Sequence, residues 1–148
     1  MRYSKKVKTV AMAMNAETPT LGTFNREKGR AFTEGLLMGW LVYLNEILNL
    51  NKPMTEDQIE MCAIDIANDY YALKISDLTL LFKRIISGEF GEFYESLSIP
   101  KVLSFFRAYF EERCNEAETQ SMTDHKDFSS DETFNISKNV KRILRNNK

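Results

Sequence analysis

The feature that most restricts the fold of this chain is the run from Pro53 to Arg113, in which helix start and stop signals follow one another in order. Thr55 and Gln58 form a capping-box pattern, with two acids in the same first turn. Gly88 stands where a helix is expected to stop. These signals divide the run into three helices, and the chain shows no strand with clean alternation. The sequence therefore predicts an all-α fold.

The three helices have distinct caps and apolar faces. The first begins after Thr55, the second is capped by Ser76 or Asp77, and the third is capped by Ser98. The connector Gly88–Leu97 repeats Gly-Glu-Phe, and we expect an ordered turn there. The third helix carries a bulky stripe made of Val102, Phe105, Phe106, Tyr109 and Phe110. Base stacking is the alternative use of such rings, but their helical spacing favours core packing.

A further helix is predicted upstream of this run. Its start is Asn25 or Thr33, which are competing N-caps, and it continues to about residue 50. A second apolar stripe makes this helix apolar on more than one face, as in a central helix or one that meets a partner. That stripe consists of Leu36, Tyr43, Ile47 and Leu50. Gly35 and Gly39 would let another helix approach closely, and we expect internal packing there, with a dimer face as the alternative.

The predicted organisation is a small bundle of about four helices with flexible basic segments at both ends. Residues 1–24 have weak periodicity and contain Pro19 and Gly22, so we expect a basic arm that is extended or only partly helical. The helical domain covers residues 25–119. An acidic polar linker, 120–134, then leads to a basic C-terminal segment, 135–148. The length of 148 residues suits one domain with tails.

Charge is distributed unevenly although the formal net charge is only −1. Residues 1–30 carry +5, residues 51–120 carry −6, and the last fourteen residues carry +5. Basic ends are drawn to phosphates and anionic surfaces, whereas an acidic body is repelled by a nucleic-acid backbone. The candidate contacts to nucleic acid or to an acidic partner are Lys138, Lys141, Arg142 and Arg145. The plainer interpretation is that terminal bases only keep the protein in solution.

The sequence offers little for catalysis, and we predict no catalytic residue, no metal site and no cofactor. His125 is the single histidine and lies in the polar linker. Cys62 and Cys114 form no disulfide framework, which predicts a reduced, intracellular setting. Asp65 and Asp69 stand four residues apart and are the one pair that could jointly hold Mg²⁺, although the same spacing arises on any acidic solvated face. No stretch is long and apolar enough to predict a membrane span.

Part of the chain resembles a known group of proteins. Pro53–Ile59 belongs to the resemblance, which covers about residues 35–115. The other matching positions are Asp77-Leu78, Phe82, Gly88, Gly91, Tyr94, Leu97, Val102, Phe105, Tyr109 and Glu112-Arg113. The group consists of small, mostly uncharacterised all-α proteins of phages and mobile elements of gut bacteria. More loosely, the architecture is similar to phage helicase loaders and replisome organisers, which are adaptors that bind a replicative helicase or initiator.

This resemblance implies a phage-type setting, in the cytoplasm of a bacterial host or in a virion. The leading hypothesis is a non-enzymatic interaction module of DNA replication, whose core docks a helicase or initiator and whose basic C-terminal segment contacts DNA or an acidic protein. The alternative is a structural or packaged phage protein that assembles through its helices with its own copies or with virion proteins. A third hypothesis is an enzyme that uses carboxylates and a metal, and it depends on Asp65 and Asp69.

Overall fold

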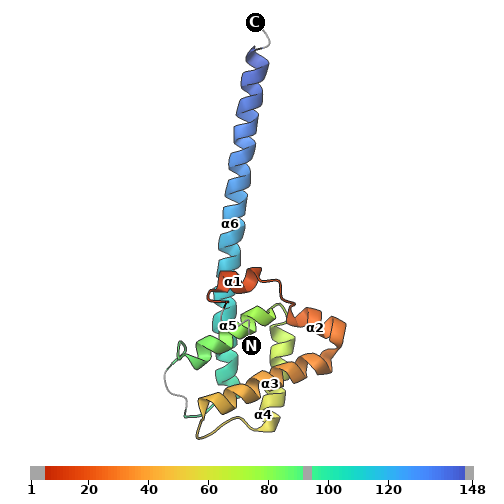
Figure 1. Cartoon of the computed structure of the whole chain (residues 1–148), viewed down its shortest axis with the longest axis vertical. Coiled ribbons are helices and arrows are strands. Elements are labelled where there is room, and N and C mark those ends of the chain that lie inside the picture. Colours follow the sequence, from red (N-terminus) through yellow and green to blue (C-terminus); the bar gives the residue numbers. More distant parts are fainter. Residues whose placement is uncertain (1–5, 92–94, 146–148) are drawn as a thin grey trace. The chain divides into compact units, whose positions relative to one another are not determined.

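The chain is all-helical in the part that its structure, a computed structural model, describes: residues 6–91 and 95–145, with side chains as far as residue 126. Six α-helices lie within these residues, and Figure 1 labels each of them. They are α1 (Val10–Asn15), α2 (Leu21–Lys28), α3 (Arg30–Leu48), α4 (Glu56–Asp69), α5 (Ile75–Ile86) and α6 (Ile99–Arg145). The all-α class is thus confirmed, while the expected number of about four helices was too low.

The chain divides into two compact units, residues 1–113 and residues 114–148. The first unit contains α1 to α5 and the beginning of α6, and the second contains the remainder of α6. The predicted boundary at residues 119 and 120 lies inside α6. This helix also runs through residues 120–134, where we expected a polar linker. We predicted four segments: a basic arm, a helical domain, a polar linker and a basic C-terminal segment. This division of the chain stays a prediction.

A glycine accounts for one of the additional helices. Gly29 has a φ of 91°, a backbone conformation that residues with a side chain rarely adopt, and it separates α2 from α3. The Thr20 side chain caps α2 by accepting a hydrogen bond from the Thr23 amide at 3.1 Å. Neither Asn25 nor Thr33 is therefore the N-cap of the long helix. Asn25 lies within α2, and Thr33 is buried within α3.

The N-terminal segment joins the core of the first unit. Its buried apolar side chains are those of Val7, Val10, Ala13 and Leu21. Helix α1 packs against α5, where the Ser76 hydroxyl donates to the Ala13 carbonyl at 2.6 Å. The Lys74 ammonium donates to the carbonyls of Met14 and Ala16, at 2.6 and 2.9 Å. Residues 6–24 are thus partly helical, as expected, but they pack against the core because their apolar residues are buried and the carbonyls at the end of α1 are satisfied.

The helix signals after Pro53 are largely confirmed. Thr55 and Gln58 form a reciprocal capping box at the start of α4, with hydrogen bonds of 3.3 and 3.0 Å. Helix α5 begins at Ile75 with Lys74 as its N-cap, so the prediction of Ser76 or Asp77 as the N-cap was wrong. Asp77 instead contributes to the cap from the first turn, by accepting from the Lys74 amide at 2.8 Å. Gly88 follows the end of α5 with a φ of 84°, as expected of a stop signal.

Aromatic side chains join four helices in the first unit. Trp40 of α3 packs on Phe82 of α5 with ring centroids 5.0 Å apart, and Phe82 meets Phe106 of α6 at 6.2 Å. Tyr70, which ends α4, packs on Phe106 at 5.4 Å. The stripe on α6 is buried or half-buried, so its predicted role in core packing is confirmed.

The connector after α5 is described only in part. Phe90 lies against the core with its ring 5.1 Å from that of Phe105. Phe93 and Tyr94 lie outside the described residues. The expectation of an ordered turn is therefore confirmed for residues 87–90, which form turns directly after α5.

Candidate interaction surface

Helix α3 is fixed from one side by the core. Thr33, Leu37, Leu41 and Leu44 recur at helical spacing and are buried. Helices α2, α4 and α5 all pack against α3. At its C-terminal end, the Asn45 amide donates to the Met54 carbonyl at 2.9 Å and accepts from the Met54 amide at 3.1 Å. These contacts hold α3 and the start of α4 in a defined geometry.

A second side of α3, next to the buried one, carries exposed apolar side chains. Phe32, Ile47 and Val42 are 50%, 48% and 42% exposed. Around a helix of 3.6 residues per turn, Phe32 and Ile47 belong to one stripe that runs the length of α3. We call this stripe the α3 face; it consists of Phe32, Leu36, Gly39, Trp40, Tyr43 and Ile47. Phe32, Gly39 and Ile47 of this stripe are exposed, whereas Leu36, Trp40 and Tyr43 are half-buried, and Trp40 also packs against the core. Apolar surface gathered along one helix in this way indicates an interaction surface.

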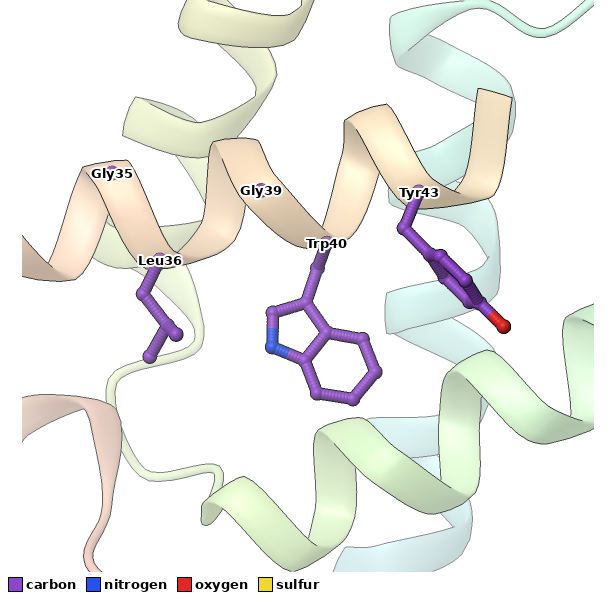
Figure 2. A pocket seen from close by; sticks show the side chains of 5 residues that line it. All are labelled: Gly35, Leu36, Gly39, Trp40 and Tyr43. Atoms are coloured by element: carbon purple, nitrogen blue, oxygen red, sulfur yellow. The ribbon is translucent and has the colours of Figure 1, made fainter. Parts of the chain in front are cut away.

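The middle of the α3 face is hollowed. A cavity of about 330 Å³ is lined by Gly35, Leu36, Gly39, Trp40 and Tyr43. Figure 2 shows the three side chains projecting from the same side of α3, while the two glycines leave the helix backbone uncovered. None of the five lining residues is charged, and the polar side-chain atoms are the indole nitrogen and the phenol oxygen. The cavity is suited to an apolar or aromatic side chain and carries no group for acid–base or nucleophilic chemistry.

The two glycines correct a prediction. A Cβ atom built on Gly35 or Gly39 meets nothing within 4 Å, so neither residue is a site of close internal packing. The expectation that another helix of the same chain packs closely against these glycines is therefore wrong. The alternative, that they belong to a dimer face, stays a prediction. Sequence reasoning had identified Leu36, Tyr43 and Ile47 as a second stripe but missed Phe32. Its position four residues before Leu36 is the signal that could have revealed it.

A second cluster of polar groups is buried in the same unit. The Asp77 carboxylate is fully buried and accepts three hydrogen bonds, from the Lys74 amide at 2.8 Å, the Tyr109 hydroxyl at 2.8 Å and Arg113 Nε at 3.0 Å. Burial, and next the charge of Asp77, raise the pKa of Tyr109 well above its ordinary value. The carboxylate is satisfied by these donors and has no exposed surface. The cluster therefore ties α5 to α6 and is not a reactive site.

Arg84 extends this cluster towards the surface. Its guanidinium pairs with Glu112 at 2.6 Å and lies over the Tyr109 ring, 5.8 Å from the centroid. Burial alone would lower the pKa of Arg84, but the hydrogen bond and the charge of Glu112 outweigh burial and raise it. A paired guanidinium of this kind stabilises the packing of α5 on α6.

The predicted contact residues are distributed differently. The positions of Lys138, Lys141, Arg142 and Arg145 lie within α6, in the second unit, and their side chains are outside the described part. Their role as contact residues stays a prediction. Asp65 and Asp69 lie on α4, and among the described residues no group of three or more His, Cys, Asp or Glu side chains is placed so that it could hold a metal ion.

The comparisons with known proteins give no family. No protein-family model, no curated protein and no solved structure matches the chain. None of the described helices combines the length and the apolar character that a membrane crossing requires. The function is therefore inferred from the α3 face and from the distribution of charge along the chain.

Proposed function

We propose that this protein is a non-enzymatic interaction module, an adaptor of phage or mobile-element type that serves DNA replication in the manner of a helicase loader. The α3 face docks a protein partner, and the basic end of α6 contacts DNA or an acidic protein surface. The single observation that carries the proposal is the hollowed apolar stripe along α3, whose ends, Phe32 and Ile47, are exposed while Leu37, Leu41 and Leu44 of the same helix are buried.

The chemistry of the α3 face suits docking. An apolar row of this length that is left in water gives a partner helix a groove into which its own side chains can pack. The indole of Trp40 and the ring of Tyr43 are the residue types that most often dominate binding energy at interfaces. The cavity takes one large side chain of the partner, and the glycines allow its backbone to come close.

The basic contact is the second part of the proposal. The four predicted positions are three and four residues apart within one helix, so they share a helix face. The resulting local charge attracts phosphates or acidic side chains, and salt weakens the attraction.

The docking part is tested with Gly39→Glu. Nothing lies within 4 Å of the new Cβ, and glutamate favours helix more than glycine does, so the variant retains the fold while it fills the groove with a charge. Met61→Glu is the matched control, because Met61 is 59% exposed and lies on a different helix, α4. In quantitative affinity capture from host cells, a replicative helicase or initiator should be recovered with the wild type and Met61→Glu, and lost with Gly39→Glu. Equal recovery of every protein by all three would refute docking through α3.

The basic contact is tested by binding to a labelled DNA duplex over a salt series. Replacing the four predicted bases by serine should flatten the slope of log K against log salt by about 3 to 4, since each neutralised phosphate contributes about 0.9. The control removes three exposed bases from the first unit, Lys52, Lys83 and Arg107. An unchanged slope in the four-base variant would remove the basic segment from the proposal.

A second candidate function is a structural or packaged phage protein that assembles through its helices. The α3 face favours it as well, because an exposed apolar groove fits copies of the same chain. Sedimentation of the purified protein separates the two: large assemblies favour the structural role, whereas a small species that captures a helicase or initiator favours the adaptor.

A further inference from the structure

We infer that residues 6–18 form a strap that opens from α5 and closes on it as one unit, while the rest of the first unit stays folded. The strap consists of α1 and the residues on either side of it. The inference goes beyond the proposed function, because it concerns neither the α3 face nor the basic end of α6. It assigns a regulatory device to the N-terminal segment, namely an autoinhibitory contact that covers one face of α5.

The polar contacts of the strap converge on one turn at the start of α5. Lys74 Nζ donates to two carbonyls at the end of α1, which lie 2.6 and 2.9 Å away. The Ser76 hydroxyl donates to the Ala13 carbonyl at 2.6 Å, and the Ser76 amide donates to the Thr18 hydroxyl at 3.3 Å. Because these donors belong to residues 74 and 76 alone, the loss of one contact weakens the placement of the others.

The apolar part of the strap is small. Its buried side chains are those of Val7, Val10 and Ala13. Helix α1 has six residues, and a helix of that length is not stable in water by itself. Segments with few buried apolar contacts open at a lower free energy than the core of a domain does. The strap therefore has the properties of a segment that opens locally.

The rest of the first unit has a core that does not depend on the strap. One face of α5 is buried in this core and consists of Leu78, Leu81, Phe82 and Ile85. On this face, the Phe82 ring meets those of Trp40 on α3 and Phe106 on α6. These ring contacts do not involve residues 6–18. Opening of the strap thus leaves the packing of α3, α5 and α6 in place.

The strap covers the other face of α5. Ser76 bonds to the strap, and Thr79 and Leu80 follow it by three and four residues, so the three share one helix face. All three are buried. When the strap opens, this face becomes accessible. A ligand that binds the face binds only the open state, and it therefore shifts the equilibrium towards opening.

The Lys74 ammonium controls this equilibrium. It is half-buried, and among the described residues it forms no ion pair with a carboxylate, so its charge is met by the two strap carbonyls. A cation at the end of a helix also interacts favourably with the helix dipole. In Lys74→Met the apolar stem is retained and the charge is lost. The strap then loses two hydrogen bonds to a charged donor, while the core face of α5 is unchanged.

The first experiment is native-state hydrogen exchange of the full chain, followed residue by residue by NMR. The Ala13 amide, which donates to the Thr9 carbonyl, reports on the strap, and the amides of Leu41 and Leu44 report on the core. The Ala13 amide should exchange at least tenfold faster than the two core amides, and urea should accelerate it less. If all three amides exchanged at one rate with one urea dependence, the strap would open only by unfolding of the whole unit, and the inference would be wrong.

The second experiment repeats the exchange measurement on Lys74→Met, with Lys83→Met as the matched control. Lys83 is exposed and lies nine residues further along the same helix. Lys74→Met should accelerate exchange at Ala13 at least tenfold and leave the core amides of α3 within about threefold. Lys83→Met should change neither. No acceleration at Ala13, or equal acceleration at Ala13 and in α3, would contradict control of the strap by Lys74.

The third experiment tests whether opening uncovers the face of α5, by thiol labelling in a Cys114→Ser background. Leu80→Cys places a thiol under the strap, and Leu81→Cys places one on the core face. Iodoacetamide should label position 80 at least tenfold faster than position 81, and adding Lys74→Met should accelerate labelling at position 80 only. Equal labelling rates at the two positions would show that the strap does not gate this face.

Discussion

Removing the Tyr109 hydroxyl is the sharpest test of what holds α5 to α6. In Tyr109→Phe the ring stays, so its packing and the position of Arg84 over it are retained. The lost group is a hydroxyl that donates to the fully buried Asp77 carboxylate at 2.8 Å. Hydrogen bonds to a charged group contribute about 1.5 to 3 kcal/mol. Because this one is wholly buried, we expect a loss of about 2 to 3 kcal/mol in the free energy of unfolding.

The measurement is urea unfolding followed by circular dichroism, with a thermal scan beside it. At about 4 °C per kcal/mol for a unit of this size, the melting temperature should fall by about 8 to 12 °C. Tyr71→Phe is the matched control, since Tyr71 is 62% exposed, and its effect should stay within about 0.5 kcal/mol. The reasoning would be refuted if Tyr109→Phe were as stable as this control, because the buried carboxylate would then not depend on its phenol donor.

Three further predictions concern glycines, thiols and pH. Gly39→Ala should raise the free energy of unfolding by about 0.5 to 1 kcal/mol, because the new Cβ meets nothing and alanine favours a helix. Gly29→Ala should lower it, because Gly29 has a φ of 91°. Urea midpoints of both variants, measured at low protein concentration to keep the chain monomeric, check the two signs. Cys114 is exposed and should react quickly with iodoacetamide. Cys62 should react only when the protein unfolds, because burial, and next the charge of Asp65, raise the pKa of its thiol to about 12. Equal reaction rates of the two thiols would contradict the packing of α4. The free energy of unfolding should fall as the pH rises from about 9 towards 12. Cys62 and Tyr109 have raised pKa values in the folded state, so the unfolded chain loses these two protons at a lower pH than the folded chain does. A pH series of urea midpoints in which Tyr109→Phe gives no flatter decline than the wild type would contradict this linkage.

Local signals predicted the parts of the fold that local physics decides. The capping box at Thr55 needs only residues three apart, and the stop at Gly88 needs only a residue that tolerates a positive φ. The aromatic stripe on α6 was recognised from its periodicity alone. In each case the signal itself, a cap pair, a glycine or a spacing along one helix, lies within a few turns, so a single sequence contains it.

Long-range contacts decided what the sequence did not predict. The docking of the N-terminal segment depends on Ser76 and Lys74, about sixty residues further along the chain. The partners of Asp77 at Tyr109 and Arg113 are 32 and 36 residues away. The candidate site shows the same limit. Its apolar stripe was visible in the sequence, but whether Gly35 faced the core or the solvent depended on which side of α3 the other helices covered.

The way α1 is held has a consequence for the order of events during synthesis. This helix has six residues, and so short a helix is not stable in water by itself. Its terminal carbonyls bond to Lys74 and Ser76, which leave the ribosome some sixty residues later. Helix α1 thus emerges well before it can become ordered, and its apolar side chains stay available to chaperones until α5 has been made.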